Sequence, residues 1–133
     1  MEVDESIAEN EEMIIRLEDE DYNDNDAFEY FAKKDDRNRN SIRLKIKIAS
    51  HKKTNSDVLK YLSEDEAFEV RKAILSTTRP GGVPKKILEA LLEDEDEWVN
   101  RRANKYYEEN INRYRDFSII IEEEQEKPKG PTR

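Results

Sequence analysis

The sequence predicts an all-α domain in which short helical hairpins repeat to form a small α-solenoid, with capping helices at its N-terminus. The first observation is a pair of similar stretches, "DVLKYLSEDEAFEVRKAIL" at 57–75 and "KILEALLEDEDEWVNRRAN" at 86–104. Each stretch places an acidic break between two short apolar stripes, as expected of helical-hairpin repeats. The second observation is that 43 % of the 133 residues are charged and 35 % are hydrophobic. That composition allows only a thin core.

The N-terminal part of the chain predicts two capping helices, at 4–21 and 27–34, because apolar residues recur there at helical spacing. Polar loops follow them at 21–26, "DYNDND", and 35–41, "DDRNRNS". The stripe of the first helix consists of Ile7, Met13, Ile14 and Leu17.

The stretch "SIRLKIKIAS" at 41–50 is ambiguous. Its isoleucines and leucine alternate with basic residues, which is the period of a half-buried strand. The same residues also pair at four-residue spacing, as they would on a helix. We favour a helix, because a lone strand needs a partner and only "FSIII" at 117–121 could supply one.

Further helices are predicted at 54–62, 67–76, 85–94 and 98–117. Pro80, Gly81 and Gly82 form a turn that no helix can continue through. In the last helix we expect Trp98 and Tyr107 to belong to the core. "SIII" at 118–121 either extends that helix or forms an edge strand. We divide the chain into acidic N-terminal capping helices, a helical-repeat domain and a disordered charged tail, at 1–38, 39–121 and 122–133.

Overlaying the two stretches gives the repeat in detail. At a shift of 29 residues, Val58, Leu62, Glu64 and Asp65 match Ile87, Leu91, Glu93 and Asp94. At a shift of 30, Phe68, Arg71 and Ala73 match Trp98, Arg101 and Ala103. A partial third copy lies upstream, where "LKIKIAS" at 44–50 matches "VRKAILS" at 70–76. The one-residue difference in shift falls in the acidic break, where loops tolerate insertions.

Residues 42–105 resemble the variant leucine-rich repeat family, a relative of the HEAT-like helical repeats. The shared marks include Thr54, Leu59, Leu62, Asp65, Val70, Arg71 and Ala73. Lys47, His51 and Asn100 depart from the family pattern. The resemblance implies paired short helices in a right-handed curved array that binds partners and performs no chemistry. Some members carry an iron–sulfur cluster on cysteines, and this sequence has no cysteine.

Charge is distributed unevenly along the chain, whose net charge is −9. Residues 1–30 carry a net charge of −12, whereas residues 33–53 carry +7. Either these segments neutralise each other within the chain, or they form two surfaces for partners of opposite charge. No apolar run is long enough to span a bilayer and the N-terminus is not a signal peptide, so we expect a cytoplasmic protein without a membrane partner.

The sequence offers no convincing catalytic or metal site, and we expect no enzyme activity and no cofactor. The carboxylates of the acidic breaks look solvated, whereas acid–base catalysis uses carboxylates in apolar surroundings. The segment 21–26 lacks the glycine of a calcium loop. His51 is the single histidine, and "RPGGVP" at 79–84 lacks the lysine of a phosphate-binding loop.

Three functions remain for a chain of this kind. The first is a protein-interaction module that binds an unidentified protein on its repeat face. The second is an acidic inhibitor, immunity or anti-defence protein that masks a basic cleft. The third is nucleic-acid binding through 33–53, which the pI of 4.8 opposes. The candidate partner-binding residues are Lys52, Lys53, Arg71, Arg79, Glu93, Asp94, Glu95, Asp96, Arg101 and Arg102. For Arg71 and Arg101 the competing interpretation is structural pairing with an acidic break or with carbonyls at a helix end.

Overall fold

A computed structural model describes residues 2–34, 38–76 and 79–114, and every regular element in them is helical. The all-α prediction is therefore confirmed for this part of the chain. The predictions for 118–121 and for the tail at 122–133 lie outside the described residues. The helices are α1 (Glu2–Arg16), α2 (Asn25–Ala32), α3 (Arg39–Ser50), α4 (Ser56–Ser63), α5 (Phe68–Ala73), α6 (Lys85–Leu92), α7 (Glu97–Glu109) and α8 (Ile111–Tyr114).

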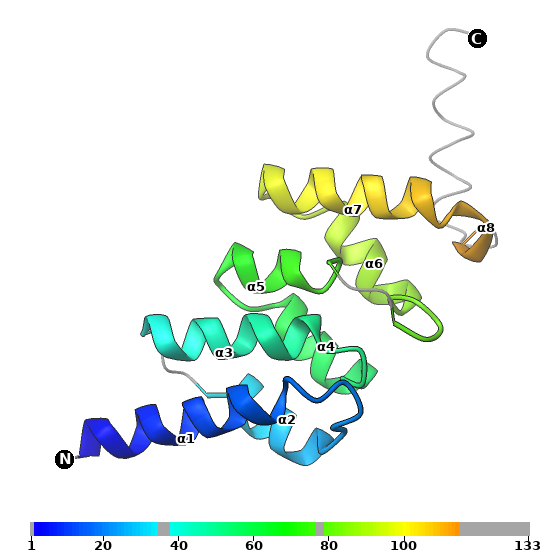
Figure 1. Cartoon of the computed structure of the whole chain (residues 1–133). Coiled ribbons are helices and arrows are strands. Elements are labelled where there is room, and N and C mark those ends of the chain that lie inside the picture. Colours follow the sequence, from blue (N-terminus) through cyan, green and yellow to red (C-terminus); the bar gives the residue numbers. More distant parts are fainter. Residues whose placement is uncertain (1, 35–37, 77–78, 115–133) are drawn as a thin grey trace, which may run out of the picture.

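The helices are arranged in two layers (Figure 1). Helices α1, α3, α5 and α7 contact one another in that order and form the first layer. Helices α2, α4 and α6 also contact one another in order and form the second. Each second-layer helix contacts the first-layer helix that follows it in sequence. The chain thus alternates between layers as it advances from one end of the molecule to the other.

The ambiguous stretch at 41–50 lies within α3, so the strand alternative is wrong and the helix is confirmed. Asn38 caps its start, because its side chain accepts a hydrogen bond of 2.8 Å from the Ser41 N–H. Leu44 and Ile48, four residues apart, are both buried. Helix α3 lies between α1 and α5 and contacts both. Burying residues four apart against these neighbours is possible for a helix and not for a strand.

One apolar cluster runs through both layers. Every helix from α1 to α8 contributes to it, so the thin core is continuous along the molecule. Burial of these side chains supplies the main stabilisation of such a charged chain. The largest fully buried members are Phe28, Leu44, Ile48, Leu59, Leu62, Ile74, Leu75, Leu88, Leu91, Val58, Val70 and Val83.

The predicted helix at 98–117 instead begins at Glu97 and breaks at Asn110, and α8 follows the break. The break lets Tyr114 turn back to the loop before α6, where its hydroxyl donates to Val83 O at 2.6 Å. The Tyr106 hydroxyl accepts from Val83 N at 2.9 Å and lies 3.1 Å from the Tyr114 hydroxyl. Two tyrosines thus satisfy both backbone groups of a buried residue.

One core assignment in this region is corrected and one is refined. Trp98 is 59 % exposed, and Tyr106 is the most deeply buried tyrosine of α7, whereas Tyr107 is partly buried and packs against the core. Trp98 stands in the first turn of α7, where Lys72 and Arg101 lie near its ring. Helical spacing shows which residues share a face of a helix, but it does not show which face another element covers. Tyr106 is the more deeply buried tyrosine because its hydroxyl binds the Val83 backbone.

The Tyr114 contact predicts sensitivity to alkali. Burial, followed by the hydrogen bond with Tyr106, raises the pKa of Tyr114 above its ordinary value. Above about pH 10 the unfolded chain releases this proton while the folded protein keeps it, so the free energy of unfolding falls as pH rises. Urea unfolding at pH 8 and above pH 10 should show a smaller alkaline loss in Tyr114→Phe than in the wild type. Tyr30→Phe, at an exposed position, should behave as the wild type. An equal loss in all three proteins would contradict the expectation.

The turn between α5 and α6 is set by its proline and glycines. Gly82 N donates to Arg79 O at 2.9 Å, and Gly81, with a φ of 78°, occupies the position of a type II turn that favours glycine. Gly82, with a φ of 74°, lies so close to α8 that a Cβ atom there would come within 2.5 Å of Arg113 Cδ. The turn therefore brings Arg79 and α8 together.

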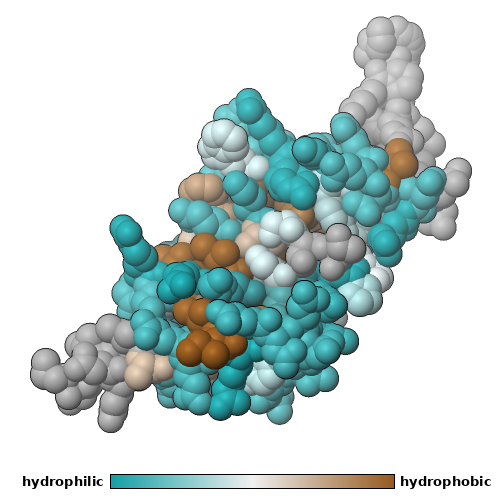
Figure 2. Space-filling view, viewed as in Figure 1, coloured by the Kyte–Doolittle hydropathy of each residue, from teal (hydrophilic) through white to brown (hydrophobic). Residues whose placement is uncertain are grey.

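The surface is mostly hydrophilic on the face shown in Figure 2, and its hydrophobic atoms gather over α1 and α3. Large apolar side chains that are exposed elsewhere stand apart from one another, as is common on protein surfaces. The exposed large apolar residues are Ile15, Tyr30, Tyr61, Trp98 and Ile111.

Candidate interaction surface

One aspartate of each acidic break forms a little-exposed ion pair, contrary to the expectation that these carboxylates are solvated, whereas Glu64, Glu66, Glu93 and Glu95 are exposed. Arg71 binds Asp94 with two hydrogen bonds, Nε to Oδ2 at 2.8 Å and Nη2 to Oδ1 at 3.0 Å. The remaining terminal nitrogen of Arg71 donates to the backbone carbonyls of Asp65 and Glu66. The hydrogen bonds with Asp94 raise the pKa of the Arg71 guanidinium. Arg71 is therefore committed to contacts within the chain.

An equivalent pair lies one repeat earlier. Lys45 Nζ is 3.0 Å from Asp65 Oδ2, with the two side chains 4 % and 6 % exposed. Lys45 aligns with Arg71 in the overlay of 44–50 on 70–76, and Asp65 aligns with Asp94. Each pair joins a first-layer helix to the acidic break of the following hairpin. The acidic breaks thus tie successive hairpins together.

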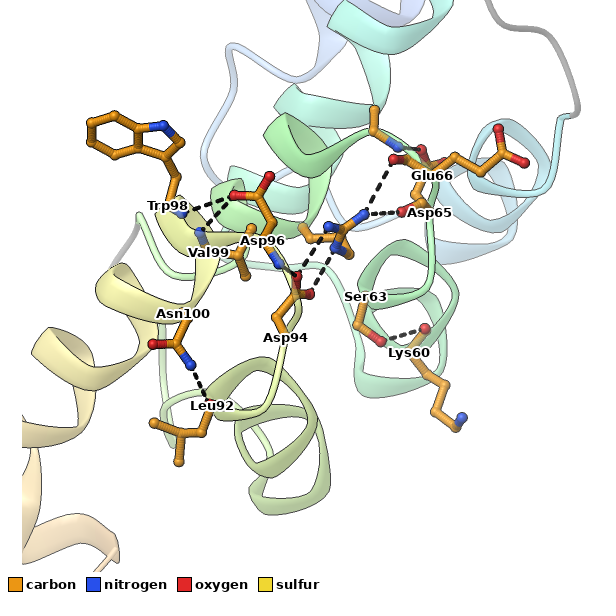
Figure 3. Close-up of polar contacts among 12 residues, drawn as sticks. Lys60, Ser63, Asp65, Glu66, Leu92, Asp94, Asp96, Trp98, Val99 and Asn100 are labelled. Carbon is orange, nitrogen blue, oxygen red and sulfur yellow. Dashed lines mark hydrogen bonds and ion pairs between the residues drawn. The ribbon is translucent and has the colours of Figure 1, made fainter.

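The break before α7 has a second structural task, shown in Figure 3. The Asp96 carboxylate accepts hydrogen bonds from the backbone N–H groups of Trp98 and Val99, at 2.8 and 3.2 Å, and so caps the helix. Within the same loop, the Asp94 carboxylate accepts a hydrogen bond of 2.9 Å from the Asp96 backbone N–H. The Trp98 ring points away from these contacts (Figure 3).

The remaining candidate residues do not form one surface. Arg101 is exposed and pairs with Glu97, the last residue of the acidic stretch 93–97 and the first of its own helix, so both arginines pair within the chain but only Arg71 joins two hairpins. Lys52 pairs with Glu20 at 3.0 Å, and Lys53 is exposed. Glu93 and Glu95 are exposed on either side of Asp94. The structure does bring Arg79 and Arg102 together, in a small pocket described below.

The acidic N-terminal segment folds back on the basic one. Glu9 lies 3.7 Å from Lys34 and Glu20 lies 3.0 Å from Lys52. His51 reinforces the contact: Lys53 N donates to its Nδ1, so its Nε2 carries the proton and donates to Asp19 O at 2.9 Å. Neutralisation within the chain thus accounts for part of the charge asymmetry.

A groove crosses the second layer between α2, α4 and α6. Its volume is about 880 Å³, within the range of sites that bind sizeable ligands. Tyr61 and Pro84 contribute apolar surface to the groove, and the buried Ile87 lines it beneath them with little exposure of its own. Charged side chains of both signs surround this apolar strip: Glu29, Asp57, Lys60, Glu64, Lys85 and Lys86.

Tyr61 is the most distinctive residue of the groove. Its side chain is 46 % exposed, although it stands on a helix whose other large apolar residues are buried. Lys33 Nζ lies 4.7 Å from the centre of its ring and also pairs with Glu29 at 2.6 Å. We did not single out Tyr61 from the sequence. An aromatic residue outside the apolar stripe of α4 is the signal that could have identified it.

Comparisons with known proteins add no family: no family model, no curated protein and no solved structure matches the sequence. In the described residues, no group of three or more acidic, histidine or cysteine side chains is placed to hold a metal ion. None of the described helices is both long and apolar enough to cross a membrane. The groove, at about 880 Å³, is several times larger than the small pocket that Arg79 and Arg102 line, which is about 120 Å³.

Proposed function

We propose that the chain is a non-enzymatic protein-interaction module, a short solenoid of helical hairpins that holds an extended polypeptide segment in the α2–α4–α6 groove. The observation that carries this proposal is the groove itself, with the half-exposed Tyr61 ring beside Pro84 and Ile87. Tyrosine is enriched among the residues that dominate binding energy at interfaces, because it offers a large rigid surface and a polar end.

The order in which the helices of each layer contact one another supports the solenoid part of the proposal. First-layer helices meet in sequence order, and so do second-layer helices, as in stacked helical repeats. The Lys45–Asp65 and Arg71–Asp94 pairs occupy matching positions in successive hairpins. A repeated tie at a repeated position is what a solenoid of this kind requires, since each hairpin must join its neighbour in the same way.

The shape and charge of the groove favour a polypeptide ligand. The groove crosses three neighbouring helices, whose axes are typically 8–10 Å apart, so roughly six extended residues would span it. Lysines and carboxylates both line it, which suits a peptide with an apolar anchor and charged neighbours. A nucleic-acid backbone would require predominantly basic side chains. Lys33, Lys34 and Lys52 of the basic segment are paired within the chain, which further disfavours nucleic acid.

The test is selection from a phage-displayed library of linear peptides on the full-length protein. We expect enriched peptides to bind the wild type and to lose at least about tenfold in affinity on Tyr61→Ala, since truncation of an anchor residue costs 2 kcal/mol or more. Fluorescence anisotropy of labelled synthetic peptides measures the affinity.

Tyr30→Ala is the matched control, because Tyr30 is an exposed tyrosine of α2 that does not line the groove. Peptides that bind Tyr61→Ala and the wild type equally would overturn the groove as the binding site. A labelled single-stranded oligonucleotide provides the second comparison. Tighter binding of the oligonucleotide, falling steeply with salt, would overturn the proposal in favour of nucleic-acid recognition.

A further inference from the structure

A second, smaller pocket lies where the turn before α6 meets α7 and α8. Its volume is about 120 Å³, enough for several water molecules and therefore for a small ion. The polar residues that matter for its chemistry are Ser76, Arg79, Arg102, Glu109 and Arg113. Three guanidinium groups, brought from three different elements, therefore border one small space; we call it the arginine pocket.

Arg79 is the innermost of the three. It is 5 % exposed, and its terminal nitrogens donate to Ala49 O and Ile74 O at 2.8 Å and to His51 O at 3.1 Å. Burial lowers the pKa of its guanidinium, which an arginine nevertheless keeps protonated at neutral pH. Its Nε is buried and has no hydrogen-bond partner among the described residues. Arg79 thus brings to the pocket a charge that is bonded only to neutral carbonyls there.

Arg102, on α7, also has a buried nitrogen that lacks a hydrogen-bond partner in the described part of the chain. This nitrogen is its Nη1. Buried donors are almost always satisfied in folded proteins, so one unpartnered guanidinium nitrogen on each of two arginines that line the same pocket requires an explanation. Glu109, the carboxylate that lines the pocket, pairs with Lys105 at 4.0 Å.

Arg113 closes the third side. Its side chain lies directly over Gly82, where even a Cβ atom would clash with it. Tyr114, the next residue, is fixed by its bond to Val83 O. The turn and α8 are therefore held together, which keeps the borders of the arginine pocket in place.

We propose that the arginine pocket binds a small oxyanion of the phosphate or sulfate type, either free or as the phosphate group of a small molecule. Guanidinium groups bind such anions through pairs of parallel N–H bonds, and Nε of Arg79 and Nη1 of Arg102 are the buried donors that lack a partner among the described residues. Bound there, the anion compensates the buried Arg79 charge. The site is independent of the peptide groove, so either proposal can fail alone.

The experiment follows binding by the amide NMR shifts of the full-length ¹⁵N-labelled protein, titrated with inorganic phosphate, sulfate or O-phosphoserine. Ionic strength is kept constant with sodium chloride, which separates specific binding from screening. We expect saturable shifts at residues 76, 82 and 109 in the wild type. Arg102→Gln should weaken binding by about tenfold or more, because a charge-assisted bond is lost.

Arg101→Gln is the matched control, since it removes the same charge from an exposed neighbour that does not line the pocket. Its affinity should equal that of the wild type. Shifts that do not saturate, or that weaken equally in Arg101→Gln and Arg102→Gln, would overturn the site. Stronger binding of O-phosphoserine than of inorganic phosphate assigns the site to a phosphate group on a larger molecule, and the reverse order assigns it to the free anion.

Discussion

The Asp65→Asn variant is expected to lose about 3–5 kcal/mol of its free energy of unfolding, because it removes one partner of a buried ion pair. Lys45 is 3 % exposed, and among the described residues the substitution leaves its ammonium group one hydrogen bond, to the neutral Lys34 O at 2.8 Å. Asparagine retains the side-chain oxygen that accepts from Ala67 N at 2.9 Å. The loss therefore reports on the charge and not on the local turn.

Urea unfolding followed by far-UV circular dichroism measures the effect. Glu97→Gln is the matched control, because it removes the exposed partner of Arg101, and should cost about 0.5 kcal/mol or less. The double variant Lys45→Met with Asp65→Leu should recover most of the loss, since it removes both charges from the interior. If Asp65→Asn were no less stable than Glu97→Gln, the ion pair would not be a tie between hairpins.

The Lys45–Asp65 and Arg71–Asp94 ion pairs show which contacts could be predicted from the sequence and which could not. The overlay of the repeats matched Arg71 with Arg101 and left two interpretations of both, partner binding or structural pairing, and Arg71 does pair structurally, with Asp94. It did not identify Lys45, whose place among alternating basic residues looks solvent-facing. Which lysine meets an aspartate twenty residues later depends on how the hairpins stack, and apolar spacing carries no information on that.

Arg101 shows the opposite failure, because matching sequence positions did not produce matching contacts. Arg71 reaches the acidic break of the next hairpin, whereas α7 is the last long helix of its layer in the described residues. Arg101 therefore has no following break to meet there and pairs with Glu97 in its own helix. A repeat pattern predicts contacts only where the neighbouring repeat exists.

The helices themselves were easier to predict than the surfaces between them. Periodic apolar residues identified most helices, including α3, and the turn at 79–82 followed from proline and glycine. The groove and the arginine pocket are each assembled from several elements distant in sequence. "RPGGVP" at 79–84 was interpreted only as a turn, yet its first residue, Arg79, is buried and lines the arginine pocket.

The Arg79→Met variant is expected to lose about 2–4 kcal/mol of the free energy of unfolding, because buried carbonyls lose their donor. Nη2 of Arg79 reaches both Ala49 O near the end of α3 and Ile74 O just after α5, at 2.8 Å each. His51 O is less affected, since it also accepts from Thr54 N at 3.2 Å. Methionine retains a long apolar side chain, so the loss reports mainly on the hydrogen bonds.

Two further variants decide whether the guanidinium geometry is responsible. Arg79→Lys keeps the charge but replaces the planar fork with a single ammonium group, which cannot reach three carbonyls in different directions equally well. It should therefore recover only part of the loss in urea unfolding. Arg101→Met, at an exposed position, should unfold close to the wild type. Full stability of Arg79→Met would mean that these carbonyls are satisfied without Arg79. The buried guanidinium would then serve the arginine pocket alone, and stability and anion binding would separate in the same variant.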